Sequence, residues 1–310
     1  MILTVTLNTA VDKFYQLNRL NAYEVSRVQK VNNTAGGKGL NVSRVAVQLG
    51  QNVTAMGFVG GHIGSYFESL ITQPEITKAF TKIKAETRSC INAWDDEKGA
   101  STEFLEPGAN VTPDEVEAFY ADFARELPNA TVVTLCGSVP NGVETTVYAK
   151  LIEMCKKANK PVLVDTSSQL LVESVKACPT FIKPNTDEIA QLLGYKVESK
   201  DAIIEAAEKL TQQGIGMVVV SLGADGAVMV CEEGVFHGKP PKINAVNTVG
   251  CGDSMTAGFA VGIAKGLSKE EQLRLAVAVS AANALCMSTG GYEQSDFDWL
   301  LPQVSITKIK

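Results

Sequence analysis

The segment NTVGCGD, residues 247–253, stands directly before a stretch with strong helical character, residues 254–266. The backbone N–H groups of Gly250, Cys251 and Gly252 can therefore turn toward one point at the start of a helix. This geometry suits negative charge on a phosphoryl group during its transfer. Asp253 would then face an attacking hydroxyl group and accept its proton. On the local sequence alone, Asp253 could equally be only the N-cap of that helix.

A second glycine-rich segment, GGKGLN at residues 36–41, lies where a loop enters a helical pattern that continues through Leu49. Free N–H groups and the positive end of a helix dipole favour an anion at such a place. The segment is not a Walker A loop, and no turn between a strand and a helix carries the G-x-G-x-x-G fingerprint of dinucleotide-binding folds. The alternative is a glycine-rich turn that merely contains Lys38.

A cation, an amide and a carboxylate follow the end of another predicted strand, at Lys183, Asn185 and Glu188. Ligands of α/β proteins bind at this edge of the sheet, beyond the carboxyl ends of the strands. Magnesium keeps several waters and needs only one or two carboxylates, so Glu188 alone would suffice for a Mg²⁺-nucleotide. The alternative is an exposed turn that opens a helix through Leu193.

Weaker signals lie near these segments. SLGADG, residues 221–226, ends the next strand and suits either close backbone approach to phosphates or a tight β-turn. Asp12 follows the first strand and could accept two sugar hydroxyls, although an exposed loop aspartate is the commoner arrangement. Arg27, Lys38 and Arg88 are the few basic residues nearby, and a bidentate arginine suits a substrate phosphate. Solvated surface charge is the alternative for each of them.

Short runs of apolar and β-branched residues alternate with amphipathic helical stretches along the chain. The runs are residues 2–7, 53–59, 131–135, 162–164, 181–182 and 217–221. Continuous apolar runs suit a sheet that is buried on both faces, and repeated strand–helix–strand units imply parallel pairing. Capping boxes at Thr112 and Ser268 predict two helix starts. We therefore predict an α/β fold with a mostly parallel sheet.

The region from Ser89 to Leu105 breaks this rhythm, because it reads as two alternating strands around a polar turn at residues 95–99. This pattern predicts a hairpin. Together with residues 12–33 it could form a small sheet that serves as a lid or a dimer contact; a plain surface hairpin is the alternative. No flexible linker divides the chain. We therefore expect one domain over residues 1–310, with lid segments at roughly 12–33 and 86–107.

Composition excludes several classes of function. The 310 residues carry a net charge of -6, which argues against binding to nucleic acid or to an anionic membrane. Seven cysteines without a C-x-x-C pair indicate reduced thiols, and neither a leader peptide nor a run of 18 apolar residues is present, so we expect a cytoplasmic protein. The two histidines, His62 and His237, lack partners at metal-ligand spacing, which disfavours a zinc site or a His-dependent triad.

Taken together, the motifs resemble the ribokinase-like (PfkB) carbohydrate kinases, in order and across nearly the whole chain. They are TLNTAVD (6–12), TAGGKGLNVSR (34–44), ETR (86–88), GSVP (137–140), KPNTDE (183–188) and NTVGCGDSMTAGF (247–259). Within the family, the chain is similar to the hexulose-phosphate kinase branch, which contains tagatose-6-phosphate kinase and 1-phosphofructokinase. The resemblance implies a three-layer α/β/α fold, a mostly parallel central sheet of about eight strands, and a small β-sheet lid that can also build a homodimer.

The resemblance also implies ATP-dependent phosphorylation of a ketohexose monophosphate to its bisphosphate. Either tagatose 6-phosphate would accept at carbon one or fructose 1-phosphate at carbon six, and the sequence leaves both open. Alternatives are another sugar or sugar phosphate of the family, such as fructose 6-phosphate, fructose or ribose, and a non-catalytic sugar-phosphate sensor. ATP and Mg²⁺ are the implied cofactors. K⁺ is a further candidate, because family members often bind it near the anion hole.

Site roles follow by matching motifs to the family. Asp253 would be the base, with the anion hole formed by Gly250, Cys251 and Gly252. The sugar would be held by Asp12, Gly37, Lys38 and Asn41, and its existing phosphate by Arg27, Lys38, Arg88 and Ser138. The triphosphate and Mg²⁺ would be organised by Lys183, Asn185 and Glu188, and the ATP cleft lined by Ser221, Gly223, Gly226 and Asn283.

One position departs from the family pattern, because Cys251 stands where Ala or Ser is usual. The role of its backbone amide does not depend on the side chain. Since a helix N-terminus lowers the pKa of a thiol, we hypothesise that this cysteine makes the activity sensitive to thiol reagents.

Overall fold

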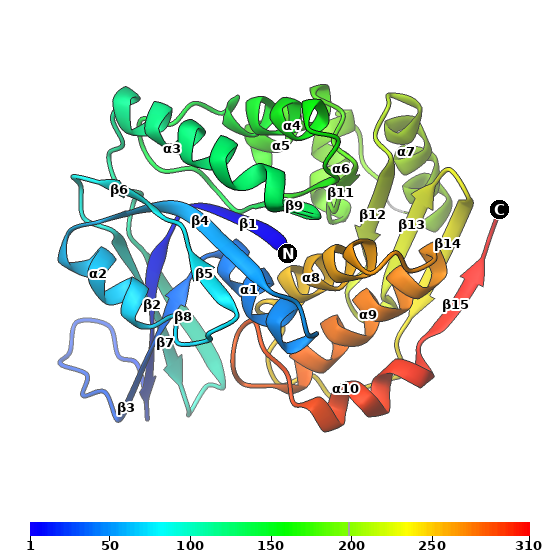
Figure 1. Ribbon diagram of the computed structural model, residues 1–310. Helices are drawn as coiled ribbons and strands as arrows, with labels where there is room; N and C mark the ends of the chain where they lie inside the picture. Colours follow the sequence, from blue (N-terminus) through cyan, green and yellow to red (C-terminus); the bar gives the residue numbers. More distant parts are fainter. Residues whose placement is uncertain (198) are drawn as a thin grey trace.

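The computed structural model of the protein describes residues 1–197 and 199–310. Within them, eleven strands form the main sheet, in the order β15-β14-β13-β12-β11-β10-β9-β1-β4-β5, and β6 also pairs with β4 (Figure 1). The strands are β1 (Ile2–Asn8), β4 (Val53–Gly60), β5 (Ile76–Lys78), β6 (Thr81–Ile83), β9 (Val132–Cys136), β10 (Val162–Asp165), β11 (Phe181–Ile182), β12 (Met217–Ser221), β13 (Ala227–Cys231), β14 (Gly234–Lys239) and β15 (Ser305–Lys308). Pairing is parallel from β12 to β5 and β6, which confirms the predicted sheet.

Helices cover both faces of this sheet and form the predicted three layers (Figure 1). One face carries α1 (Lys38–Gln48), α8 (Cys251–Ala264), α9 (Lys269–Leu285) and α10 (Gln294–Leu300). The other carries α3 (Pro113–Glu126), α4 (Val147–Lys157), α5 (Ser168–Lys176), α6 (Thr186–Leu193) and α7 (Lys200–Gln212), and α2 (Gly61–Ser69) packs beside β4.

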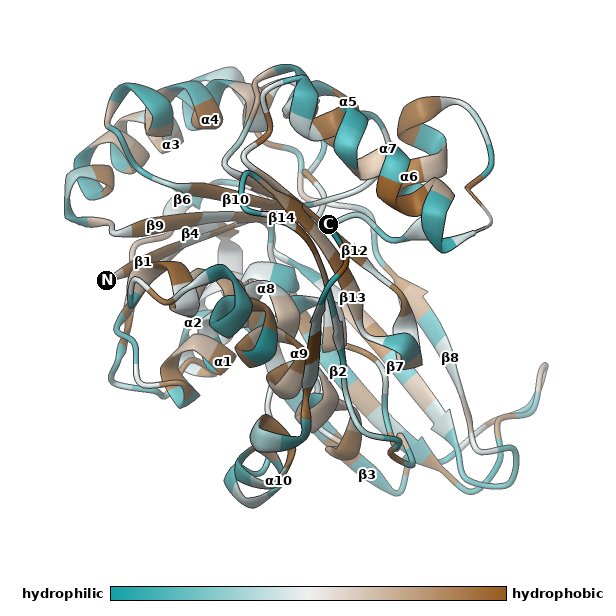
Figure 2. Cartoon of the chain, turned by 90° about the vertical axis from the view of Figure 1, so that its right-hand side faces the viewer, coloured by the Kyte–Doolittle hydropathy of each residue, from teal (hydrophilic) through white to brown (hydrophobic). Residues whose placement is uncertain are grey.

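The buried strands contribute side chains to two separate hydrophobic cores, one on each face of the sheet, because successive side chains of a strand point to opposite faces. Ile2 packs in the core on the α8 side and Leu3 in the core on the α3 side, and Met217 and Val218 divide in the same way. Figure 2 shows the consequence, with hydrophobic strands enclosed between helices whose outer faces are hydrophilic. This two-sided burial explains why the strands read as continuously apolar runs.

The sheet is larger than the eight or so strands expected, because β13, β14 and β15 extend it as an antiparallel edge. Two helices also begin earlier than predicted: α1 at Lys38 and α8 at Cys251. The capping boxes at Thr112 and Ser268 are both confirmed. In each of them, the side chain accepts from the third helical residue and a glutamate returns the bond, which satisfies donors that would otherwise lack partners.

A second, four-stranded sheet stands against the body of the molecule, in the order β3-β2-β7-β8 (Figure 1). Its strands are β2 (Ala10–Leu17), β3 (Lys30–Gly36), β7 (Arg88–Asp95) and β8 (Ala100–Leu105), and the antiparallel pairing of β7 with β8 confirms the predicted hairpin. Glu86 attaches this sheet to the body, because its carboxylate accepts 3.0 Å hydrogen bonds from the N–H groups of His62 and Ile63 at the start of α2.

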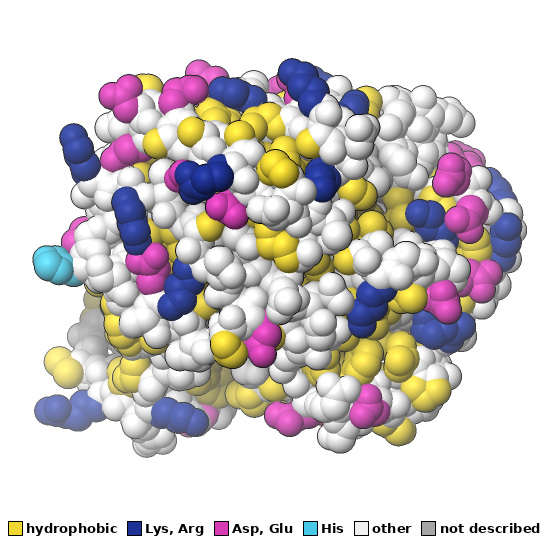
Figure 3. Space-filling model, viewed as in Figure 1, with side chains coloured by type: hydrophobic (Ala, Val, Ile, Leu, Met, Phe, Trp, Pro, Cys, Tyr) yellow, Lys and Arg dark blue, Asp and Glu magenta, His cyan; other side chains and the backbone are white. Residues whose placement is uncertain are grey.

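Acidic and basic side chains are interspersed on the surface of the protein. On the face shown in Figure 3, Lys and Arg side chains lie among Asp and Glu side chains. Within the described residues, none of the helices has the length and apolar character needed to cross a membrane.

Candidate active site

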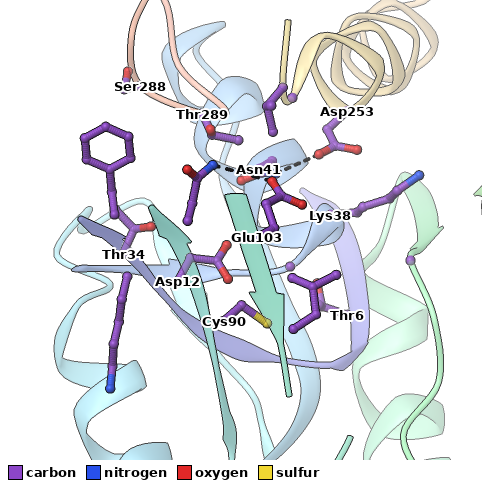
Figure 4. A pocket seen from close by; sticks show the side chains of 18 of the residues that line it. Thr6, Asp12, Thr34, Lys38, Asn41, Cys90, Glu103, Asp253, Ser288 and Thr289 are labelled. Carbon is purple, nitrogen blue, oxygen red and sulfur yellow. Dashed lines mark hydrogen bonds between the residues drawn. The ribbon is translucent and has the colours of Figure 1, made fainter. Parts of the chain in front are cut away.

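A cavity of about 790 Å³ lies between the small sheet and the carboxyl ends of β1, β9 and β10 (Figure 4). Strand ends of this kind are where α/β proteins bind ligands. Most of the residues predicted for the sugar and for catalysis line this one cavity. They are Asp12, Gly37, Lys38, Asn41, Arg88, Ser138, Gly250, Gly252 and Asp253.

The start of α8 forms one wall of the cavity. Gly250 is the N-cap of this helix and has a φ of 86°, in the left-handed region that favours glycine. Among the described residues, the N–H groups of Gly250, Gly252 and Asp253 have no backbone partner, whereas that of Cys251 lies 3.3 Å from the Thr248 carbonyl. The helix start therefore offers amides to an anion, and Asp253 is not its N-cap.

Asp253 is buried, and its Oδ2 accepts a 2.6 Å hydrogen bond from Nδ2 of Asn41 in α1 (Figure 4). Burial, and then the negative charge of Asp165, raise the pKa of Asp253 to about 6, against the opposing effects of Lys38, Asn41 and Lys183. A carboxylate with this pKa is ionised at neutral pH and is a better proton acceptor than an ordinary aspartate.

Asp165, at the end of β10, holds two lysines beside this helix start. Its carboxylate oxygens lie 3.4 Å from Nζ of Lys38 and 3.2 Å from Nζ of Lys183, and Thr256 donates to it at 2.9 Å. Burial would raise the pKa of Asp165, but the charges of the two lysines and its hydrogen bonds outweigh burial and hold that pKa at about 2. Lys183 is directed at α8, because a Cβ on Gly252 would lie 3.2 Å from its Nζ.

Asp12 lies on the opposite wall, on β2. Glycine is required next to it, because a Cβ on Gly36 would lie 2.1 Å from the Asp12 carboxylate. Burial raises the pKa of Asp12 to about 6, although the positive charges of Arg44 and Arg88 act against the shift. The adjacent N-cap of α1, Gly37, has a φ of 108°. A hydrogen-bonding carboxylate therefore faces the cavity next to a second helix start.

Arg88 and Ser138 form a polar corner of the cavity. The Arg88 guanidinium donates to the carbonyl of Glu106 at 3.0 Å and to that of Asn8 at 3.3 Å. Nδ2 of Asn8 in turn donates to Ser138 Oγ at 3.1 Å. The guanidinium is thus fixed at the wall by neutral carbonyls, and its charge is not paired with a carboxylate in these contacts. Such a group suits a phosphate.

Arg44, in α1, was not predicted as a site residue, although it lines the same cavity. Its guanidinium donates to Oδ1 of Asn41, to the carbonyl of Ala35 at 2.7 Å and to that of Thr289 at 3.4 Å. It therefore fixes the orientation of the Asn41 amide, so that Nδ2 rather than Oδ1 points to the base.

Asp165 and Glu103 are further residues that the sequence analysis missed. Glu103 lies on β8, where its side chain lines the cavity. A carboxylate at the end of a predicted parallel strand was a usable signal for Asp165. For Arg44, its position three residues after Asn41 on one helix was a signal, since such residues are neighbours on the helix surface. Alternation along β8 shows which side chains share a face, but not that this face lies over the cavity.

A second cavity, of about 690 Å³, gathers part of the predicted nucleotide site, including Asn185, Ser221 and Gly223. Asn185 is the N-cap of α6 and forms a capping box with Glu188, which was the structural alternative for this motif. Oε2 of Glu188 accepts from the Asn185 N–H at 2.9 Å. Oε1 of Glu188 takes no part in the two hydrogen bonds of the capping box. The capping role and a role toward a cation are therefore compatible.

Six predicted residues line neither cavity: Arg27, Lys183, Glu188, Gly226, Cys251 and Asn283. Arg27 is exposed in the segment between β2 and β3 and lines neither cavity. Gly226 is buried, and its backbone packs closely against the neighbouring strand, since a Cβ there would lie 2.0 Å from the carbonyl of Gly238. It therefore forms part of a turn and does not line the cleft. Asn283 is fully buried as well. Burial raises the pKa of the Cys251 thiol, so the prediction that the helix N-terminus lowers this pKa is wrong.

Comparison with known proteins gives concordant matches. The model of the pfkB family of carbohydrate kinases matches residues 5–295. A tagatose-6-phosphate kinase of Staphylococcus epidermidis is 38% identical to the chain over the whole length of both. Phosphofructokinase-2 from Escherichia coli, solved in complex with potassium, matches with a TM-score of 0.90 and 27% identity, over 97% of this chain and 98% of that one. The same enzyme in complex with fructose-6-phosphate matches with a TM-score of 0.86 and 26% identity, over the same shares of the two chains.

The three-layer fold, the helix start beside Asp253 and these matches define a carbohydrate kinase. The chain belongs to the pfkB family of these enzymes.

Proposed function

We propose that this kinase transfers the γ-phosphoryl group of ATP to a hydroxyl group of a ketohexose monophosphate and forms the bisphosphate. The observation that carries the proposal is the placement of Asp253 at the start of α8, in the same cavity as the guanidinium of Arg88. The base and the phosphate-binding group lie on different walls of this cavity, which suits a sugar that already carries one phosphate.

In the proposed reaction, the acceptor oxygen bonds to the γ-phosphorus while the bond from that phosphorus to the β–γ bridging oxygen breaks. The hydroxyl proton passes to Asp253, and ADP leaves. The open amides of Gly250 and Gly252 stabilise the charge on the transferring group, together with the nearby ammonium of Lys183. Asn41 contributes by holding the carboxylate of Asp253 in place through its hydrogen bond.

Acceptor recognition is assigned to the walls described above. Asp12, Gly37, Lys38 and Asn41 would bind sugar hydroxyls, and Arg88 with Ser138 would bind the existing phosphate. We place tagatose 6-phosphate, accepting at carbon one, ahead of fructose 1-phosphate, accepting at carbon six. The reason is the 38% identity to a tagatose-6-phosphate kinase over the full chain.

Nucleotide binding is assigned to the second cavity and its neighbours. Lys183 and Asn185 would contact the triphosphate, Ser221 and Gly223 would line the cleft, and Glu188 would hold Mg²⁺ with the help of waters and phosphate oxygens. Bound Mg²⁺ would neutralise charge on the phosphates. The potassium complex of the related phosphofructokinase-2 supports K⁺ as an additional activator. Replacing K⁺ by Na⁺ in the assay buffer tests this point.

The experiment that tests the function measures ATP consumption with Mg²⁺ against a matched panel of acceptors. The panel contains tagatose 6-phosphate, fructose 1-phosphate, fructose 6-phosphate, fructose and ribose, compared by kcat/KM. A strong preference for one phosphorylated ketose supports the proposal and identifies the acceptor carbon. A preference for fructose or ribose would overturn the phosphate role of Arg88, and turnover of none would favour a sugar-phosphate sensor.

We further propose that the chain is one kinase domain, with the four-stranded sheet as its lid, and that two copies pair through this sheet in the cytoplasm. Every residue of β8 is exposed, and Val31 and Phe104 present apolar surface on the same sheet. All seven cysteines are free thiols, which suits a reducing compartment. A tetrameric form of the related phosphofructokinase-2 is known. Light scattering of wild type and Phe104→Asp tests the pairing, since the variant should be monomeric.

A further inference from the structure

Asn283 is a fully buried polar side chain near the end of α9, directly behind the start of α8. The family resemblance assigned it to the wall of the ATP cleft, where it would need a free donor or acceptor. An asparagine side chain has two N–H donors and an oxygen with two lone pairs. The use of these four positions therefore decides what the residue can do.

All four positions are used inside the protein. Nδ2 donates to the carbonyl of Val249 at 3.0 Å and approaches Sγ of Cys251 at 3.6 Å. Oδ1 accepts from Oγ of Ser254 at 3.0 Å and from the N–H of Gly290 at 3.1 Å. The side chain therefore joins the loop that precedes α8, the first turn of α8 and the segment after α9. It has no free donor or acceptor left for a nucleotide.

These contacts surround the open amides of the helix start. A Cβ on Gly250 would lie 2.9 Å from the N atom of Gly290 and 3.3 Å from Oδ1 of Asn283, so the loop packs directly on this network. Gly290 also packs on Asn41, because a Cβ on Gly290 would lie 2.7 Å from Cβ of Asn41. Asn41 in turn donates to Asp253. Asn283 thus supports both the anion-binding loop and the residue that holds the base.

We infer that Asn283 is a positioning residue for phosphoryl transfer, which fixes the Val249–Asp253 segment, and that it does not bind the nucleotide. This inference rests on the proposed function, since it assigns the helix start to the transferring phosphoryl group. A support of this kind acts mainly in the transition state, where the amides must already point at the developing charge. Its loss should therefore lower kcat and leave the ground-state binding of MgATP nearly intact.

The test is Asn283→Asp, which keeps the shape and the two accepted bonds but cannot donate to the Val249 carbonyl. We expect kcat to fall on the order of 10- to 100-fold, while KM for MgATP changes less than about threefold. Gln272→Glu is the matched control, because it makes the same chemical change at a buried amide of the same helix, whose Nε2 donates to the Leu267 carbonyl. The control should lower stability without the fall in kcat.

A second readout does not need turnover. Amide hydrogen exchange of Val249, Cys251 and Ser254 should be faster in Asn283→Asp than in wild type, and unchanged in Gln272→Glu, because their N–H groups are hydrogen-bonded within the supported segment. If Asn283→Asp does not fold, Asn283→Ser should show the same two effects.

Three results would decide against the inference or separate it from the function. A rise in KM for MgATP with an unchanged kcat would make Asn283 a nucleotide ligand. Unchanged exchange in both Asn283 variants would overturn the positioning role. If wild type phosphorylates no acceptor of the panel, the proposed function fails, and the exchange measurement still decides whether Asn283 fixes the loop.

Discussion

Nδ2 of Asn41 donates a 2.6 Å hydrogen bond to Oδ2 of Asp253, although the two residues are 212 positions apart in the chain. The bond joins the first turns of α1 and α8, so it links the two helix starts that line the candidate active site. Arg44 donates to Oδ1 of Asn41 and so fixes the amide, and in the proposed reaction the other oxygen of Asp253 receives the proton of the acceptor hydroxyl.

Removal of the base should abolish turnover and spare binding. Asp253→Asn keeps the shape of the side chain but cannot accept a proton, so kcat should fall by about 10³-fold or more. Dissociation constants for MgATP and the sugar phosphate, measured by calorimetry, should stay within about threefold of wild type. Near-normal turnover would exclude Asp253 from the proton transfer.

Activity should depend on pH through the same carboxyl group. Because the pKa of Asp253 is raised to about 6, the base is protonated and inactive below that pH and ionised above it. We expect kcat/KM to rise with increasing pH through about 6 and then to level off. A profile that is flat from pH 5 to pH 8 would contradict this assignment.

Asp165→Asn should move that pH profile and weaken the fold. Removal of the Asp165 charge takes away a repulsion that raises the pKa of Asp253, and it leaves Lys38 and Lys183 to lower that pKa further. The acidic limb should therefore shift to lower pH. Lys183 would be buried without its partner, and such a loss costs on the order of 3 kcal/mol in the free energy of unfolding.

Urea unfolding measures that loss directly. Asp122→Asn is a suitable control, because Asp122 pairs with the exposed Arg125 and exposed pairs contribute about 1 kcal/mol or less. Equal losses in the two variants, or an unmoved pH limb in Asp165→Asn, would contradict the role assigned to Asp165.

Arg88→Ala should weaken binding of the sugar phosphate and leave binding of MgATP nearly unchanged. Loss of the guanidinium should raise KM for the sugar phosphate by about 10-fold or more, since hydrogen bonds to charged groups contribute roughly 1.5–3 kcal/mol. KM for MgATP should change little, because Arg88 lies on the wall of the first cavity. Steady-state kinetics with each substrate varied in turn provide the measurement. An effect confined to ATP would place the phosphate subsite elsewhere.

Much of the fold follows from local patterns in the sequence. The parallel strands read as apolar runs because both faces are buried, and the capping boxes at Thr112 and Ser268 fix two helix starts by chemistry that is local to four residues. The antiparallel edge was missed, although β13 and β14 are separated by only Glu232 and Glu233. Such short connections predict hairpins.

The candidate site was predictable where glycine and charge coincide in one motif, as around Lys38 and Asp253. The site was harder to predict where the role of a residue depends on packing between distant segments of the chain. Asn283 carries no local sign that four partners from three segments would saturate its side chain. Likewise, Arg27 is basic and lies within the predicted lid segment 12–33, yet it is exposed and does not line the cavity.

The contact between Asn41 and Asp253 also has a consequence for synthesis of the protein. Asp12, Lys38 and Asn41 leave the ribosome early, whereas Asp253, Asn283 and Gly290 come from the C-terminal part of the chain. A nascent or prematurely terminated chain therefore carries the residues proposed to bind the sugar, but neither the proposed base nor the proposed anion-binding loop. In the proposed mechanism, catalytic competence therefore arises only when translation is nearly finished, and we expect incomplete chains to show no kinase activity.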